Sequence, residues 1–156
     1  MSETGDRPNV IIHPPIAWAL AIGAGLAAGR LYPWHFVPPS VPRVWAGGGV
    51  LAIGFALAIW AIATMHKAGT RVETYKPTTT IVADGPYRFS RNPIYLGIFL
   101  SQTGLALGFD NLWMLAMLVP FGFVIRYGVI AREEAYLERK FGAVYGGYKS
   151  RVRRWL

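Results

Sequence analysis

The stretch Asp84-Gly-Pro-Tyr-Arg-Phe-Ser-Arg-Asn-Pro-Ile-Tyr-Leu-Gly97 is a turn-rich segment that leads directly into an uncharged apolar run. Its Gly-Pro pair disfavours a helix, whereas Pro93 suits a first helical turn, where a missing N–H costs nothing. The stretch therefore predicts a helix that begins near Pro93. Tyr87, Arg88 and Arg91 would lie at the helix entrance, where unpaired backbone N–H groups favour anions. Anchoring at a membrane interface is the alternative interpretation of the same residues.

Composition indicates a membrane protein. Of the 156 residues, 53% are hydrophobic and 15% charged, and the mean hydropathy is +0.32. The hydrophobic share is higher, and the charged share lower, than in typical soluble domains. We expect one domain, residues 1–156. The net charge of +8 comes from loops and the tail, where anionic lipid attracts basic residues, so we expect no nucleic-acid partner. Without cysteine, and with three isolated histidines, the chain offers no metal site.

Four apolar runs predict an all-α integral membrane protein with about four transmembrane helices. The last two runs are joined by the short turn Gly108-Phe109-Asp110-Asn111, which requires a C-terminal antiparallel helical hairpin. Pro120 is expected to kink the second arm of that hairpin. The predicted spans are residues 14–31, 44–65, 94–109 and 112–130.

An even number of spans places the 66–92 loop and the tail from Ala131 on the same side of the membrane. Both segments are basic, so the positive-inside rule places them, together with the N-terminus, in the cytoplasm. Within the last apolar run, Arg126 is a candidate functional residue, although snorkelling to the interface competes with that role. Glu133 and Glu134 follow, and by themselves they are typical of a solvated helix face.

The predicted topology brings these polar groups together. An entrance with Tyr87, Arg91 and Tyr95 would attract a carboxylate, and a nearby glutamate could bind a ribose or an ammonium group. S-adenosylmethionine carries all of these groups, but the physical argument does not single it out.

Several separated motifs resemble one enzyme family. They are Gly85-Pro-Tyr-Arg-x-x-Arg-Asn-Pro-x-Tyr-x-Gly97, the apolar hairpin, Glu133-Glu134, and Phe141-Gly-x-x-Tyr-x-x-Tyr-x-x-Arg-Val152. Together they resemble the isoprenylcysteine carboxyl methyltransferase family, which belongs to a wider group with the phospholipid N-methyltransferases. The resemblance covers residues 79–152.

The resemblance implies a membrane methyltransferase that holds S-adenosylmethionine in a cytosolic pocket. The sequence departs from the family where Thr79 and Asn92 replace histidines, and where Val129 replaces a substrate-side arginine. Arg126 and Arg132 lie three residues to either side of Val129, and Arg126, the deeper one, is the better substitute. The expected cofactor-binding residues are Thr79, Thr80, Ile81, Val82, Tyr87, Arg91, Asn92, Pro93, Ile94, Tyr95 and Glu133.

The predicted function is methyl transfer to a lipophilic acceptor, similar to carboxyl O-methylation of isoprenylcysteine. A carboxylate acceptor would need only a cation such as Arg126 to orient it, whereas an amine would need a base, for which Glu134 is the first candidate. Phospholipid N-methylation and small-thiol S-methylation remain open. An NADPH-dependent enzyme similar to sterol reductases and a non-enzymatic membrane scaffold are the alternatives from other classes.

Overall fold

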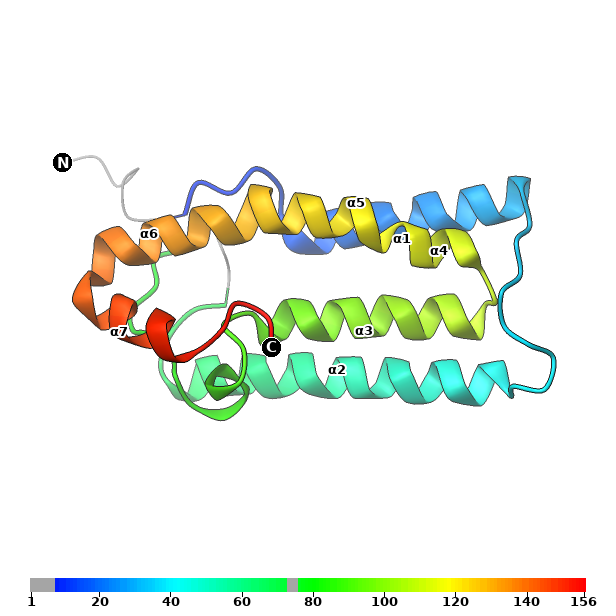
Figure 1. The fold of residues 1–156 in the computed structure, drawn as a ribbon. Helices are drawn as coiled ribbons and strands as arrows, with labels where there is room; N and C mark the ends of the chain where they lie inside the picture. The colour runs from blue at the N-terminus through cyan, green and yellow to red at the C-terminus, as the bar shows by residue number, and fades with distance from the viewer. Residues whose placement is uncertain (1–7, 73–75) are drawn as a thin grey trace.

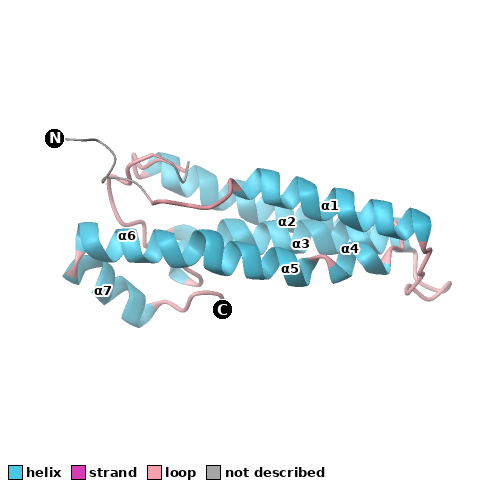
Figure 2. Ribbon diagram, turned by 90° about the horizontal axis from the view of Figure 1, so that it is seen from above, coloured by secondary structure: helices cyan, strands magenta, loops and turns pink. Residues whose placement is uncertain are grey.

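The computed structural model describes residues 8–72 and 76–156. Within these ranges all regular structure is helical, as Figure 2 shows, in agreement with the predicted all-α class. Residues 78–82 form a loop without strand pairing. Residues 1–7, for which a cytoplasmic location was predicted, and residues 73–75 of the 66–92 loop lie outside the described residues.

The helices follow one another in antiparallel runs (Figure 1). Three of these runs are the single helices α1, α2 and α3, and the fourth is a chain of consecutive helical segments. The bounds are α1 Pro14–Leu31, α2 Arg43–Lys67, the 3₁₀ turn η2 Gly85–Arg88, α3 Pro93–Gly108, α4 Leu112–Ala116, α5 Leu118–Phe123, the π-helical segment η3 Val124–Ile130, α6 Ala131–Phe141 and α7 Ala143–Arg151.

The predicted boundaries agree closely for the first three helices, and α3 begins at Pro93 as expected. The fourth run differs, because it continues to Phe141 and not only to residue 130. The apolar run ends where α6 becomes amphipathic, with Glu133 and Glu134 in its first turn. Hydropathy therefore marked the end of the apolar segment rather than the end of the helix.

Two helical runs in the described residues are long and apolar enough to cross a bilayer. They are α2, with 25 residues, and the run Leu112–Phe141, with 30 residues. At 16 residues, α3 falls short of the roughly 20 residues that span a typical hydrocarbon layer. The predicted four-span topology therefore stays a prediction.

Pro120 interrupts the fourth run. The first segment, α4, ends at Ala116, four residues before Pro120, and α5 begins at Leu118. Proline lacks the N–H that would bond to the carbonyl four residues earlier, and its ring crowds that carbonyl. The predicted disturbance of this helix is therefore present at the expected place.

Glycines bring α2 and α3 into close contact. A Cβ added to Gly54 would lie 2.6 Å from the backbone N of Ser101, and one added to Gly97 would lie 2.6 Å from the carbonyl oxygen of Gly54. Similarly, a Cβ on Gly104 would lie 2.4 Å from the backbone N of Leu51. Backbones approach this closely only where both helices present small residues. The glycines thus hold α2 and α3 together as a pair.

Asp110 closes the end of the molecule opposite to the tail. Its Oδ1 accepts hydrogen bonds from the backbone N–H groups of Phe36 and Val37 at 2.9 and 2.8 Å. Its Oδ2 pairs with Arg43 Nη1 at 3.1 Å and His35 Nδ1 at 3.2 Å. The Val37 and Phe36 hydrogen bonds lower the pKa of the Asp110 carboxyl. The carboxylate thereby fastens the 32–42 connection to the turn between α3 and α4.

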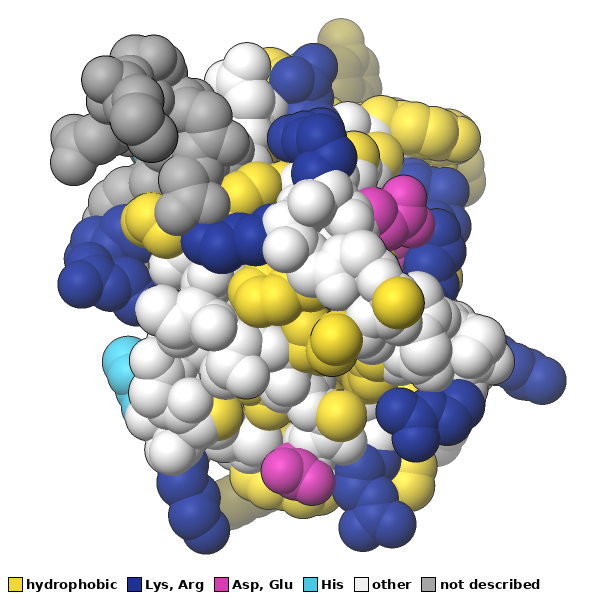
Figure 3. All heavy atoms as spheres, turned by 90° about the vertical axis from the view of Figure 1, so that its left-hand side faces the viewer, with side chains coloured by type: hydrophobic (Ala, Val, Ile, Leu, Met, Phe, Trp, Pro, Cys, Tyr) yellow, Lys and Arg dark blue, Asp and Glu magenta, His cyan; other side chains and the backbone are white. Residues whose placement is uncertain are grey.

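The described part of the 66–92 loop and the tail meet at the other end, together with α6 and α7 (Figure 1). The two segments therefore lie at one end of the molecule, and their location on one side of a membrane stays a prediction. Viewed from that end in Figure 3, dark-blue basic side chains surround a central area that contains hydrophobic side chains. The candidate functional site lies at this end.

Candidate functional site

A cavity of about 840 Å³ opens at this end of the molecule. Single ligands are usually bound in pockets of about 300–1,000 Å³, so this cavity has room for a molecule of cofactor size. It is lined by residues of α1, α2, the 70–82 loop, η2, the start of α3, α6 and α7. Segments from both halves of the sequence therefore build one site.

The lining of the cavity changes character from one side to the other. The side formed by α1 and α2 is apolar and includes Ile16, Trp18, Phe55 and Ile59. Ile16 is 52% exposed and Ile59 62%, so this side is continuous with the apolar outer surface. The opposite side carries tyrosines, two glutamates and an arginine from η2, the start of α3 and the C-terminal helices. The cavity thus suits an amphiphilic ligand.

Most of the predicted site residues line this cavity, and two do not. Thr79 is exposed and donates through Oγ1 to the carbonyl of Gly69 at 3.0 Å. Arg126 lies beside its exposed neighbour Tyr127, with Cζ 5.3 Å from the ring centroid. Neither is a lining residue. The predicted residues that line the cavity are Thr80, Ile81, Val82, Tyr87, Arg91, Asn92, Pro93, Ile94, Tyr95, Glu133 and Glu134.

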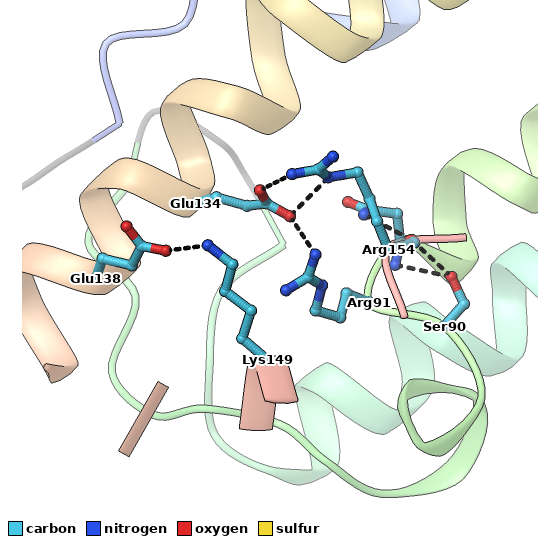
Figure 4. Close-up of polar contacts among 7 residues, drawn as sticks. Ser90, Arg91, Glu134, Glu138, Lys149 and Arg154 are labelled. Atoms are coloured by element: carbon cyan, nitrogen blue, oxygen red, sulfur yellow. Dashed lines mark hydrogen bonds and ion pairs between the residues drawn. The ribbon is translucent and has the colours of Figure 1, made fainter. Parts of the chain in front are cut away.

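Glu134 is the centre of an ion-pair network, drawn in Figure 4. Arg154 donates to it from Nε to Oε1 at 3.0 Å and from Nη2 to Oε2 at 2.6 Å. Arg91 Nη2 lies 3.1 Å from Oε1. Two guanidinium groups stabilise the carboxylate form of this side chain, and both of its oxygens are occupied. The geometry thus gives Glu134 a role in holding the two arginines, in contrast to the general base expected for an amine acceptor.

Arg91 has hydrogen-bonding capacity that nothing in the described residues uses. Its side chain is only 8% exposed and lines the cavity, yet Nε and Nη1 have no hydrogen-bond partner. An unpaired buried donor costs about 1–3 kcal/mol, and more when it is charged. Such a cost is usual where a ligand supplies the missing acceptor. The position therefore suits an anionic group, as the sequence predicted for the entrance of α3.

The side chain of Asn92 forms a hydrogen bond with the C-terminal tail. It occupies the N-cap position of α3 without capping it through its side chain, and its Nδ2 donates to the carbonyl of Arg154 at 3.0 Å. The Ser90 hydroxyl donates to the same carbonyl at 3.1 Å. Asn92 thus lines the cavity while its amide nitrogen holds the C-terminal segment in place.

A residue of the C-terminal helix α7 fixes the position of Tyr87. It lies in η2, which Gly85 initiates with a φ of 55°, a conformation that favours glycine. The backbone carbonyl of Tyr87 accepts a hydrogen bond from the Tyr148 hydroxyl at 2.9 Å. Burial raises the pKa of Tyr148 to about 12, so the hydroxyl is a neutral donor at physiological pH. This contact fixes the η2 turn against α7.

Tyr95 and Glu133 form the other polar contact inside the cavity. The Tyr95 hydroxyl donates to Glu133 Oε2 over a long 3.5 Å, and this is the hydrogen bond that the structure gives the Glu133 carboxylate within the described residues. Glu133 therefore keeps an acceptor oxygen for a further donor or a cation. The two adjacent glutamates accordingly differ, since Glu134 is fully paired and Glu133 is not.

The sequence did not identify Arg154 and Tyr148, whose side chains hold the polar part of the site together. Arg154 was counted with the basic tail, where its sequence neighbours are also basic, so no local pattern separates it from a lipid-binding residue. Tyr148 belongs to the C-terminal motif that carried the resemblance, but it was not assigned to the site. Spacing from the motif offered a signal for Tyr148, whereas only the folded tail identifies Arg154.

The described residues form a helical bundle with two helical runs that could cross a membrane and a large cavity at one end. The sequence profile of the family described as phospholipid methyltransferase matches residues 42–144, and the chain belongs to that family. This confirms the predicted membership of the wider group of membrane methyltransferases. A 63-residue stretch, 40% of the chain, is 43% identical to the whole length of an uncharacterized protein of Haemophilus influenzae. Family membership implies methyltransferase activity in general and a lipid or membrane-associated substrate.

Proposed function

We propose that this protein is an integral-membrane methyltransferase that uses S-adenosylmethionine to methylate a lipophilic acceptor. The observation that carries the proposal is Arg91, a buried cation with two unpaired donors beside a cavity of cofactor size. The proposal also includes the predicted orientation, with the 66–92 loop and the tail in the cytoplasm.

The residues of the polar side fit the proposed cofactor. Arg91 would bind its carboxylate through one of its unpaired donors, Nε or Nη1, and Glu133 would face a cationic group. Tyr87 and Tyr95, each less than a tenth exposed, would pack against it, and Thr80, Ile81 and Val82 would close the side of the loop. When bound, the cofactor supplies an electrophilic methyl group on a sulfonium.

The chain's contribution to the reaction is positioning and exclusion of water. The acceptor's lone pair forms the new bond to the methyl carbon, and the electrons of the broken C–S bond remain on sulfur. A carboxylate or thiolate acceptor needs no base. A protonated amine has to lose a proton first, and Glu133, with its spare acceptor oxygen, is better placed for this than the doubly paired Glu134.

The apolar side suits the acceptor. Trp18 and Phe55 are in edge-to-face contact, with centroids 6.3 Å apart, and belong to α1 and α2. With Ile16 and Ile59 they form a lining that a hydrocarbon chain can occupy from the bilayer. An isoprenylated carboxylate and a phospholipid amine both satisfy this requirement.

Isothermal titration of the purified protein in detergent tests the cofactor. Wild-type protein is expected to bind S-adenosylmethionine, and Glu133→Ala is expected to bind it more weakly. Absence of binding to the wild type would refute the proposal. Thermal melts with NADPH in parallel address the reductase alternative, because a ligand that binds the folded state raises the melting temperature.

The acceptor is identified by labelling. Membranes that contain the protein are incubated with methyl-labelled cofactor, and the labelled product is extracted. A base-labile label indicates a methyl ester, whereas a stable label indicates N- or S-methylation. A label confined to water-soluble products would contradict a lipophilic acceptor.

A further inference from the structure

The last five residues lie across the entrance of α3. The backbone N–H of Arg91 donates to the carbonyl of Arg153 at 3.0 Å, and Ser90 and Asn92 donate to the carbonyl of Arg154. The Trp155 ring then packs edge-to-face on Phe99, with centroids 5.9 Å apart. Residues 152–156, here called the strap, therefore join the segment that carries Arg91, although about 60 residues separate the two in sequence.

Arg154 and Arg91 share one carboxylate unequally. Arg154 binds Glu134 with two nitrogens, one to each oxygen, which is the two-point geometry that arginine and carboxylate favour. Arg91 reaches Glu134 with Nη2 alone. Its Nε and Nη1 stay unpaired, as Figure 4 illustrates by the single dashed line from Arg91 to Glu134.

We propose that Arg154 is a positioning residue that occupies Glu134 and thereby keeps Arg91 available for the carboxylate of the ligand. This inference rests on the proposed function. Without the Arg154 guanidinium, Glu134 would offer both oxygens to Arg91. A two-point ion pair between them would turn the Arg91 guanidinium toward Glu134 and consume one of its two unpaired donors. Arg154 thus acts on the ligand through Glu134 and Arg91, without touching it.

The test compares two ligands that differ only in charge. S-adenosylhomocysteine carries a carboxylate, and its carboxamide analogue is neutral at the same position. Titration gives the affinity of each ligand for the wild type, Arg154→Ala and Arg154→Lys. Arg153→Ala is the matched control, because Arg153 is exposed and contributes its backbone carbonyl, which the substitution leaves in place.

The wild type is expected to prefer the carboxylate by about tenfold or more, the range for a hydrogen bond to a charged group. Arg154→Ala should reduce this ratio to near one, and Arg153→Ala should preserve it. Arg154→Lys, which keeps the charge but not the two-point geometry, should give an intermediate ratio. A merely structural role would weaken both ligands equally and leave the ratio unchanged.

The outcomes separate this inference from the proposed function. If the wild type binds neither ligand, the proposed function fails. If the wild type prefers the carboxylate and Arg154→Ala keeps the full preference, the role of Arg154 is refuted while the cofactor proposal stands. The substitution leaves the backbone acceptors of the strap intact, and should Arg154→Ala not fold, Arg154→Lys decides by the same ratio.

Discussion

The hydroxyl of Tyr148 in α7 donates to the backbone carbonyl of Tyr87 in η2 at 2.9 Å, and both residues are less than a tenth exposed. This bond connects the C-terminal helices to the turn that precedes α3. The carbonyl would remain buried without a partner if the hydroxyl were removed.

Tyr148→Phe is therefore expected to destabilise the fold by about 1–3 kcal/mol, the cost of a buried group left unpaired. It should also weaken binding of S-adenosylmethionine, because the η2 turn that presents Tyr87 loses its tie to α7. Thermal melting and titration measure the two effects. Tyr32→Phe, at a position that is 71% exposed, is the control and should change neither; equal effects of the two substitutions would contradict the prediction.

Alanine substitutions at two glycines of α2 should differ in their effect on the stability of the fold. At Gly54 the new Cβ would lie 2.6 Å from the α3 backbone, so Gly54→Ala is expected to cost about 1–3 kcal/mol through overpacking. A Cβ added at Gly48 would have no neighbouring atom within 4 Å. Gly48→Ala should therefore be neutral or stabilise the fold by up to about 1 kcal/mol, because alanine favours the helix. Unfolding in denaturing detergent measures both, and similar outcomes at the two positions would refute the close α2–α3 contact.

Asp110 should give the fold an acid-sensitive contribution. Hydrogen bonds from Val37 and Phe36 lower the pKa of this carboxyl in the folded state. Its stabilising contribution is therefore fully present above the unfolded pKa of about 4 and is lost as pH falls through the lower folded value. Asp110→Asn should reduce the melting temperature at pH 7 and flatten its decline between pH 5 and 3. An unchanged decline in the variant would show that other groups control the acid limb.

Glu133→Gln should weaken binding of the charged ligand more than binding of the neutral one. S-adenosylmethionine carries a sulfonium cation and S-adenosylhomocysteine a neutral thioether, so loss of the carboxylate should weaken the former by about fivefold more than the latter. Glu138→Gln, an exposed position on the same helix, is the control. Equal losses for the two ligands would place Glu133 away from the sulfonium.

The sequence predicted the elements of this fold well because apolar runs and proline positions are local signals. Pro93 marked the start of α3, and Pro120 marked the interruption after Ala116. The predicted apolar run ends at residue 130, because the charged residues of α6 follow there. The helix itself continues to Phe141. The sequence already indicated a helix face for Glu133 and Glu134, and the structure places both in the first turn of α6.

For the site, the sequence identified the segments but not how their side chains are partnered. Most predicted residues line the cavity, because motif spacing and topology bring the α3 entrance and α6 together. Arg126 does not line the cavity and lies beside Tyr127. Val129, the position it was expected to replace, is buried in the core and does not line the cavity either. The pairing of Glu134 with Arg154 depends on where the strap lies, and that is a tertiary property.

The cavity lies along a seam between two packing units. On one side α2 packs on α3 through glycines, and on the other α1 packs against α4 and α5. One buried cluster contains Tyr95, Phe121 and Ile125 and so joins the two units. The wall that presents Tyr95 is therefore held in place from both of them.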